Sequence, residues 1–328
     1  MASPAMDSSP LVVGIDLGGT KLAALLSDRA GTPLHRVWHE HQATDYEDVL
    51  ASIAAAVAEC ATVAAGAGRP VAGLGVAVAG PLDRPRERVV KAVNLPIVDR
   101  PVGADLARRT GLPVVLENDA NAAALAEARH GAGVGAAALV VLTIGTGIGG
   151  GIVLDGQVVI GGRGGAAELG HLPVGADDMP CGCGSVGCLE QYASGTGIAR
   201  QARLAAAAGR APYLAALVDG ATDTITSRHV VVAARAADPV ATGLLADAGT
   251  RIGRALACLA ATLDPDLVLL TGGTAHAAAD FLLPAVTSAL ARQWPFREQG
   301  GPAPVRLARC GEEAGAVGAA VLAGDRFL

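Results

Sequence analysis

The sequence predicts an α/β protein with two domains. Its 328 residues are more than one hydrophobic core usually supports, so we expect two halves with a cleft between them, where small ligands commonly bind. Apolar residues make up 51% of the chain and charged residues 17%, which allows sizeable cores and excludes global disorder. Short apolar runs typical of buried strands alternate with segments of helical spacing in both halves, which favours a mixed α/β class.

The first half opens with a predicted β-hairpin, because two apolar runs lie on either side of the Gly18-Gly19 turn. Strands are expected at residues 11–17, 22–26, 71–78 and 114–116, and helices at residues 45–65 and 104–109. The second of these helices is expected to end at Gly111. Asn118 and Asp119 then stand where the last strand ends and an alanine-rich helix begins.

The second half repeats this arrangement. A strand is expected at residues 138–144, a glycine-rich turn at 145–151 and a returning strand at 152–154. Residues 131–154 carry no charge, but their glycines and β-branched side chains favour two buried strands over a membrane helix. Further strands are expected at residues 267–270 and 305–308. Because a glycine-turn hairpin opens each half, the sequence predicts a duplicated α/β unit.

These elements divide the chain into domains. We expect a short disordered tail at residues 1–10, a first domain at 11–118 and a second domain at 119–311, with the C-terminal helix 312–328 returning to complete the first domain. No linker rich in Pro or Ser separates the halves, so they are expected to hinge directly on each other.

Charge and cysteine usage restrict the partners and the compartment. The net charge of −6 and the pI near 5.6, without blocks of like charge, disfavour nucleic acid and acidic membranes. The first ten residues lack the apolar core and basic lead of a signal peptide. Three of the six cysteines crowd together, and the other three (Cys60, Cys258 and Cys310) are predicted as buried thiols. This usage predicts a cytoplasmic protein.

Two glycine turns are candidate phosphate sites. The turn at residues 14–21 offers backbone N–H groups and the Thr20 hydroxyl, with Asp16 suited to hold Mg²⁺ through water, although a tight hairpin without a ligand is an equal alternative. The turn at 145–151 matches G-x-G-x-x-G, but a strand rather than a helix follows, which argues against a dinucleotide fold. Two such hairpins on either side of a polyphosphate are the geometry of a two-domain actin-like (ribonuclease H-like) ATPase fold.

A compact cluster of sulfur and imidazole ligands predicts a zinc site. His171 precedes a C-x-C-x₄-C motif formed by Cys181, Cys183 and Cys188, and three thiolates with one imidazole satisfy tetrahedral Zn²⁺. A full set of four protein ligands indicates a structural ion held by the loop 171–188.

Asp119 is the candidate general base. A helix cap is the simpler interpretation of an Asp at this point in the chain. Phosphoryl transfer, however, requires one carboxylate within hydrogen-bond reach of the attacking hydroxyl, and Asp119 follows a predicted buried strand where such a group is expected.

These motifs, in this order, resemble those of the ROK family of sugar kinases and sugar-responsive repressors, and the chain is similar to actinobacterial glucokinases. The segments that carry the resemblance are residues 16–21 (DLGGTK), 117–121 (ENDAN), 145–151 (GTGIGGG), 168–171 (ELGH) and 181–190 (CGCGSVGCLE).

The resemblance implies residue roles, motif by motif. Asp119 would take the proton from the attacking hydroxyl, and His171 would both ligate zinc and contact the sugar. The sugar hydroxyls would bind Asn94, Asn118, Asp119, Glu168, His171 and Glu190. The phosphates of Mg-ATP would bind Asp16, Gly18, Gly19, Thr20, Lys21, Gly145, Thr146 and Gly147, and the adenosine would lie beside Gly272 and Gly273.

The implied reaction is transfer of the γ-phosphoryl group of ATP to a hexose hydroxyl, with the 6-hydroxyl of glucose as first choice. Departures from the usual pattern around Asn94 and at residues 162–166 and 271–274 leave N-acetylamino sugars, mannose, fructose, allose or a cyclitol open as acceptors. The sequence also leaves GTP or polyphosphate open as donors. A sugar-sensing repressor is the alternative from another class, but a first strand at residue 11 leaves no room for a preceding helix-turn-helix domain. The resemblance favours a homodimer, with a homotetramer left open.

Overall fold

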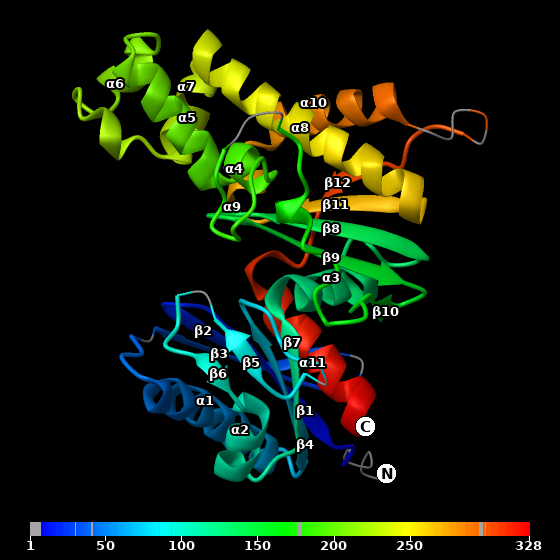
Figure 1. The fold of residues 1–328 in the computed structure, drawn as a ribbon. Helices are drawn as coiled ribbons and strands as arrows, with labels where there is room; N and C mark the ends of the chain where they lie inside the picture. The colour runs from blue at the N-terminus through cyan, green and yellow to red at the C-terminus, as the bar shows by residue number, and fades with distance from the viewer. Residues whose placement is uncertain are drawn as a thin grey trace, which may run out of the picture. The chain divides into compact units, whose positions relative to one another are not determined.

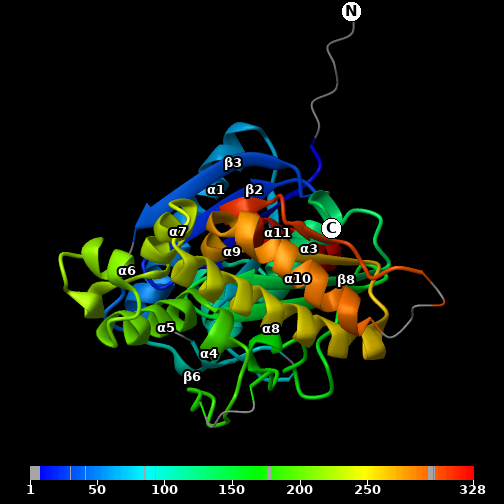
Figure 2. The same cartoon turned by 90° about the horizontal axis from the view of Figure 1, so that it is seen from above.

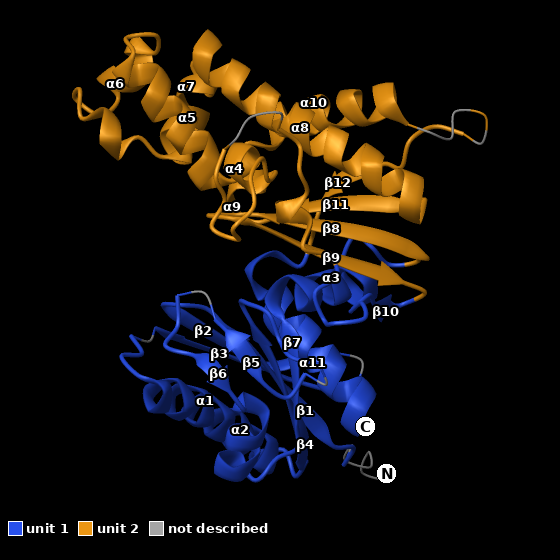
Figure 3. Cartoon of the chain, viewed as in Figure 1, with its two compact units in different colours: residues 1–134, 156–166, 310–328 blue, residues 135–155, 167–309 orange. Residues whose placement is uncertain are grey.

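The computed structural model describes residues 8–29, 31–40, 42–84, 86–92, 94–175, 179–294, 298 and 300–328. The chain forms two compact units (Figure 3), each described here by itself. Unit 1 comprises residues 1–134, 156–166 and 310–328, and unit 2 comprises residues 135–155 and 167–309. Most of the predicted tail, residues 1–7, lies outside the described residues, and residues 8–10 are exposed and without regular secondary structure.

Unit 1 is built on a five-stranded sheet with the order β3-β2-β1-β4-β7. Its strands are β1 (Leu11–Leu17), β2 (Lys21–Ser27), β3 (Pro33–Glu40), β4 (Val71–Val78) and β7 (Val114–Asn118). The predicted hairpin is confirmed, since β1 pairs antiparallel with β2, while β1, β4 and β7 run parallel. Parallel strands covered on both faces need apolar side chains in both directions, which explains why the run at residues 11–17 does not alternate.

Helices cover both faces of this sheet (Figure 1). The helices α1 (Tyr46–Gly66) and α2 (Val102–Thr110) pack on one face, and α3 (Asp119–His130) and α11 (Ala314–Phe327) pack on the other. The helix α2 ends as predicted at Gly111, which has the left-handed φ of 72°. A small hairpin of β5 (Val89–Lys91) and β6 (Val98–Arg100) completes the unit.

Among the described residues, α1 is the one helix long and apolar enough to cross a membrane. Its buried side chains, which include Val49, Ile53 and Val57, belong to the core between α1 and the sheet. Packing against the sheet accounts for its apolar character, so we interpret α1 as a core helix.

The compact unit 1 extends beyond the predicted boundary between Asn118 and Asp119 and continues to Val134. The reason is the packing of α3 against α11, which returns from the end of the chain. A Cβ atom on Gly318 of α11 would lie 1.8 Å from the carbonyl oxygen of Ala122 on α3, so this close approach requires glycine. Contacts between such distant segments hold α3 in the first unit.

Unit 2 repeats the strand order of unit 1, because β9-β8-β11-β12 correspond to β2-β1-β4-β7. Its strands are β8 (Ala138–Ile144), β9 (Ile148–Leu154), β11 (Leu267–Thr271) and β12 (Val305–Leu307). The short strand β10 (Gln157–Val158) belongs to residues 156–166 of unit 1. The strands β8 and β9 are antiparallel, and β8, β11 and β12 are parallel, as β1, β2, β4 and β7 are in unit 1. The uncharged stretch at residues 131–154 therefore forms a strand pair, as predicted, and the shared topology supports the predicted duplication.

Most of the remaining residues of unit 2 are helical. The helices are α4 (Glu190–Ala193), α5 (Gly195–Ala207), α6 (Pro212–Ala216), α7 (Ser227–Arg235), α8 (Pro239–Leu263), α9 (Gly273–Ala277) and α10 (Ala279–Gln293). The long helices α8 and α10 lie side by side (Figure 2), where Gly249 and Gly253 of α8 allow close contact with α10. The chain thus has the two-domain α/β fold that the sequence predicts.

Candidate active site

Two carboxylates of unit 1 stand at the ends of parallel strands. Asp16 is the next-to-last residue of β1, and Asp119, which directly follows β7, is the first residue of α3. The carboxyl ends of parallel strands meet at one edge of a sheet, so the topology brings both side chains to the same edge. Both residues are half-buried.

The surroundings of both carboxylates favour the protonated form. Loss of solvation, followed by the negative charge of Asp119, raises the pKa of Asp16 to about 7. Loss of solvation also raises the pKa of Asp119, although Asp119 accepts a hydrogen bond from the Ala120 N–H at 2.9 Å. A raised pKa makes Asp119 a stronger base than an exposed carboxylate.

The helix α11 shapes the space around Asp16. A Cβ atom on Gly315 would lie 2.5 Å from an oxygen of the Asp16 carboxylate. Glycine at this position therefore allows the first turn of α11 to approach Asp16 without displacing its side chain.

The first glycine turn is tight and lies next to Asn94. The N–H of Gly18 donates to the carbonyl of Lys21 at 2.9 Å, which closes the turn between β1 and β2. A Cβ atom on Gly19 would lie 2.9 Å from the Cβ of Asn94, so the predicted phosphate turn and a predicted sugar ligand are neighbours. Asn94 is exposed and has a left-handed φ of 65°, while Thr20 and Lys21 are exposed.

The side chain of Asn118 caps α3. Its Oδ1 accepts hydrogen bonds from the N–H groups of Ala120 at 3.0 Å and Asn121 at 3.2 Å, and its Nδ2 donates to the carbonyl of Gly80 at 3.4 Å. The oxygen is thus occupied by the first turn of the helix.

In unit 2, the second glycine turn contacts a predicted sugar ligand. The N–H of Gly145 donates to the carbonyl of Gly147 at 3.0 Å, and the N–H of Gly195 donates to the carbonyl of Gly145 at 2.8 Å. The carboxylate of Glu190, at the start of α4, accepts a hydrogen bond from the N–H of Ile148 at 2.9 Å. Glu190 therefore orders the backbone at the end of this turn.

A cavity of about 510 Å³ opens beside the second glycine turn, entirely within unit 2. Its lining includes three residues that the sequence predicts, Gly145, Thr146 and Gly273. The residues that sequence analysis missed are Gly195, Thr196, Ala199, Arg203, Thr226, Ser227, Arg228, Val231, Thr274 and Ala277. The cavity is suited to a polar anionic ligand, because hydroxyl and guanidinium groups converge there and none of the described lining residues is a carboxylate.

Gly272 is not part of that lining. Its φ is 93°, and a Cβ atom there would lie 2.6 Å from the carbonyl oxygen of Ile144. Its role in the structure is the turn from β11 into α9, where no other residue fits the close contact with β8.

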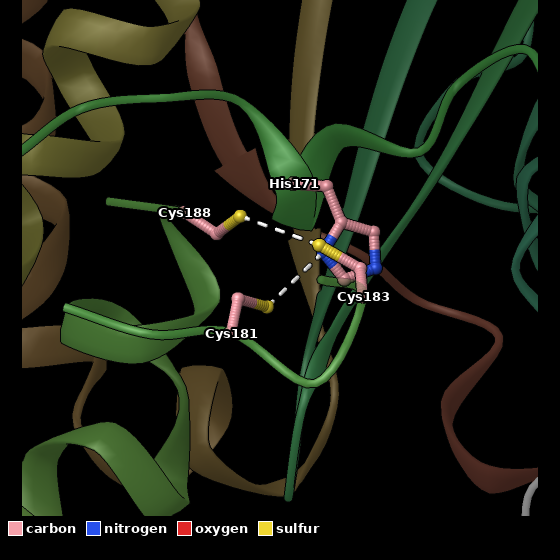
Figure 4. Close-up of side chains that lie close together, drawn as sticks. All are labelled: His171, Cys181, Cys183 and Cys188. Atoms are coloured by element: carbon pink, nitrogen blue, oxygen red, sulfur yellow. Dashed lines mark hydrogen bonds between the residues drawn. The ribbon is translucent and has the colours of Figure 1, made fainter. Parts of the chain in front are cut away.

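The predicted zinc ligands lie together in unit 2 (Figure 4). One ligand atom from each of His171, Cys181, Cys183 and Cys188 lies within 4.8 Å of the others. The Sγ atoms of Cys183 and Cys188 are 3.7 Å apart, and Cys181 Sγ is 3.6 Å from His171 Nδ1. Zn–S bonds of about 2.3 Å in a tetrahedron place sulfurs about 3.8 Å apart, so these residues fit zinc.

The imidazole of His171 faces two groups. Because Nδ1 points to the thiols, Nε2 points to Glu168, whose Oε2 is 4.0 Å away. The predicted sugar ligands His171 and Glu168 are thus close together, and a metal on Nδ1 would fix the orientation of Nε2.

The other cysteines differ from one another. Cys60 is buried as predicted, Cys310 is half-buried, and Cys258 is exposed, so the prediction of a buried thiol at Cys258 is wrong. Cys258 lies on α8, where alanines occur at both buried and exposed positions. The sequence alone therefore does not show which face of this helix is exposed.

The fold and the site together are those of a protein with the two-domain actin-like ATPase fold. The chain matches the ROK family over residues 12–326. It is 40% identical to a glucokinase from Streptomyces coelicolor over 318 residues, which are 95% of this chain and 97% of that protein.

Two solved structures are similar over almost the whole chain. A ROK hexokinase from Thermus thermophilus is 37% identical with a TM-score of 0.83, covering 96% of this chain and 98% of that one. A ROK family glucokinase from Streptomyces griseus in complex with glucose and AMPPNP is 38% identical with a TM-score of 0.79, covering 96% and 99%. This chain belongs to the ROK family.

Proposed function

We propose that this protein is an ATP-dependent sugar kinase that transfers the γ-phosphoryl group of ATP to the 6-hydroxyl of glucose. The observation that carries the proposal is Asp119, a half-buried carboxylate of raised pKa at the start of α3, in a chain similar to glucokinases. The similarity to the Streptomyces griseus glucokinase in complex with glucose and AMPPNP supports glucose and ATP as the substrates.

In this mechanism Asp119 accepts the proton of the attacking hydroxyl as the oxygen bonds to the γ-phosphorus and the bond to the β-phosphate oxygen breaks. The glycine turns at residues 18–21 and 145–147 offer N–H groups to the phosphate oxygens. The cavity beside Thr146 accommodates the nucleoside. Mg²⁺, which neutralises phosphate charge, would be held near Asp16 through water.

The sugar ligands follow the sequence-based assignment. Asn94, Asn118, Glu168, His171 and Glu190 would bind sugar hydroxyls, together with Asp119. The fit of the four ligand atoms supports a structural zinc ion that orients His171. The protein would act in the cytoplasm as a homodimer, without nucleic-acid or membrane partners, and light scattering of the purified protein distinguishes a dimer from a tetramer.

The domain assignment is also part of the proposal. Residues 312–328 would complete the first domain, which agrees with the position of α11 in unit 1, and the zinc-binding loop would belong to the second.

An ADP-release assay tests the function. We expect glucose to give the highest kcat/KM among glucose, N-acetylglucosamine, mannose, fructose, allose and a cyclitol, and ATP to exceed GTP and polyphosphate as donor. Phosphorus NMR of the product identifies the hydroxyl. Absence of sugar-dependent ADP release with every acceptor would overturn the kinase proposal, and a higher kcat/KM for another acceptor would overturn glucose.

A further inference from the structure

Arg86 has an unusual backbone and an unusual environment. It lies in the loop between β4 and β5, and its φ of 74° is a left-handed value that residues other than glycine rarely adopt. Its side chain is only 11% exposed. A charged residue held in this way inside the protein is expected to have a specific partner.

That partner is Glu117, the residue before Asn118 on β7. Arg86 Nη2 donates to Glu117 Oε1, and the Glu117 side chain is 4% exposed. The Nε and Nη1 atoms of Arg86 are buried without a hydrogen-bond partner among the described residues. Burial lowers the pKa of Arg86 to about 10, with a contribution from Arg84, so Arg86 remains charged at neutral pH.

The same carboxylate oxygen of Glu117 connects β7 to the first turn of α3. It accepts a hydrogen bond from the Asn118 N–H at 2.8 Å and another from Asn121 Nδ2 at 3.0 Å. Asp119 lies between these two anchored residues. The orientation of Glu117 therefore determines how the backbone enters α3, where the Asp119 carboxylate is attached.

We propose that Arg86 is a positioning residue for Asp119, acting through Glu117. The guanidinium neutralises and orients the Glu117 carboxylate, which in turn holds Asn118 and Asn121. Without Arg86, a buried carboxylate lacks its counter-charge and turns toward water, because an unpaired buried charge is unfavourable. The first turn of α3 then loosens and Asp119 leaves its reactive position. This inference rests on the proposed kinase function.

The primary test is the Arg86→Gln variant, assayed for sugar phosphorylation. A displacement of about 1 Å at a reacting group lowers rates by up to roughly 100-fold, so we expect kcat to fall by about 10- to 100-fold. The KM for ATP should change by less than about 2-fold, because neither Arg86 nor Glu117 is among the residues assigned to ATP. A general folding defect would instead lower the fraction of active protein, without a change confined to the start of α3.

Two further variants separate charge from structure. Arg86→Lys keeps the positive charge, so we expect its kcat to be at least about 5-fold higher than that of Arg86→Gln. The matched control is Arg84→Gln in the same loop, whose guanidinium donates to the Gly161 carbonyl rather than to Glu117. Its kcat should stay within about 2-fold of wild type.

Hydrogen–deuterium exchange supplies a measurement that does not depend on activity. In Arg86→Gln, amides of residues 118–123 should exchange at least about 10-fold faster, while the zinc-ligand segment 181–188 is unchanged. Unchanged exchange at 118–123, or a kcat within 2-fold of wild type, would overturn the positioning role. If the wild-type protein lacks kinase activity, the proposed function fails, and the exchange experiment still decides whether Arg86 orders α3.

Discussion

Glu190 Oε2 accepts a hydrogen bond from the backbone N–H of Ile148 at 2.9 Å. Glu190 is a proposed sugar ligand, and Ile148 directly follows the glycine turn that we assign to the phosphates. One carboxylate therefore contacts the backbone of the donor turn and, in the proposal, the acceptor. This contact lies within unit 2 and gives a direct physical connection between the two substrate sites.

A Gly147→Ala substitution should disturb both sites. A Cβ atom on Gly147 would lie 2.4 Å from Glu190 Oε2, so the carboxylate must move and its bond to Ile148 is lost. We expect kcat/KM for sugar and for ATP each to fall by about 10- to 100-fold in steady-state kinetics. Gly243→Ala on the exposed surface of α8 is the control, because a Cβ there meets no neighbour. If kcat/KM fell for the sugar but not for ATP, the contact between Glu190 and Ile148 would not connect the two substrate sites.

Replacing Asp119 with Asn should abolish most of the activity while preserving the fold. The Asn Oδ1 can still accept the bond from the Ala120 N–H, but the amide cannot take a proton, so kcat should fall by about 100-fold or more. Asp45→Asn is the matched control, since Asp45 also stands at a helix start and Asn caps equally well. A kcat near the wild-type value in Asp119→Asn would exclude Asp119 as the base.

The raised pKa values predict a stability that depends on pH. The pKa of Asp16 is about 7 in the folded protein and 3.8 for the same side chain in the unfolded chain. The folded state therefore binds the proton more tightly than the unfolded state. Its contribution is present at low pH and is lost as pH rises between these two values. At pH 8 the ionised side chain therefore opposes folding.

Asp16→Asn should accordingly be more stable than wild type at pH 8, by about 1–3 kcal/mol, and should lose this advantage toward pH 4. Urea unfolding of both proteins without ligands, at several pH values, measures the difference directly. Asp28→Asn is the control, because the half-buried Asp28 accepts a hydrogen bond from the Thr32 N–H at 2.9 Å that an Asn Oδ1 can also accept. A gain in the free energy of unfolding that is independent of pH would contradict the assignment to Asp16.

Zinc removal should inactivate the protein by releasing His171. Cys181→Ser removes one thiolate, so the bound zinc measured by atomic absorption should fall well below one ion per chain, and the KM for sugar should rise by at least about 10-fold. Cys258→Ser, an exposed cysteine outside the cluster, should keep its zinc and its KM. Full activity in a preparation of Cys181→Ser without zinc would show that the loop orders itself without metal.

Local sequence patterns were sufficient to predict the strand ends and the clustering of one histidine and three cysteines. The hairpin around Gly18 and Gly19 and the strand end at Asn118 follow from apolar runs and turn residues that are contiguous in sequence. The four predicted zinc ligands lie within 18 residues, from His171 to Cys188, so their spacing in the sequence brings them together.

Features that depend on distant segments could not be predicted. The strand β3 is an edge strand whose buried residue Val37 is flanked by exposed side chains, so it has no continuous apolar signal. Arg203 and Thr226 line one cavity although they lie on different elements, and Arg203 Nε reaches the carbonyl of Ile225 only after α5 and α7 have packed together. The place of α3 in unit 1 likewise depends on α11.

Glu127 on α3 should be essential for the stability of unit 1. Its side chain is buried, with 1% exposure of the residue, and its two carboxylate oxygens accept hydrogen bonds from the N–H groups of Ala132 at 2.8 Å and Cys310 at 2.6 Å. Ala132 shortly precedes Val134, where the chain first leaves unit 1, and Cys310 is the first residue of the last segment of unit 1. One carboxylate thus holds together two segments that are 178 residues apart in the sequence, from 132 to 310.

Glu127→Ala leaves both N–H groups without this acceptor, so we expect the free energy of unfolding to fall by about 2–4 kcal/mol. Glu127→Gln, whose amide retains one acceptor oxygen, should lie between Ala and wild type. The control is Glu59→Ala, because Glu59 is exposed and its bond to His39 is at the surface, where the loss should stay below about 1 kcal/mol. Urea unfolding followed by circular dichroism measures all three. Equal stability of Glu127→Ala and Glu59→Ala would mean that water replaces the carboxylate at both N–H groups, and that the packing of α3 on α11 alone holds the returning segment.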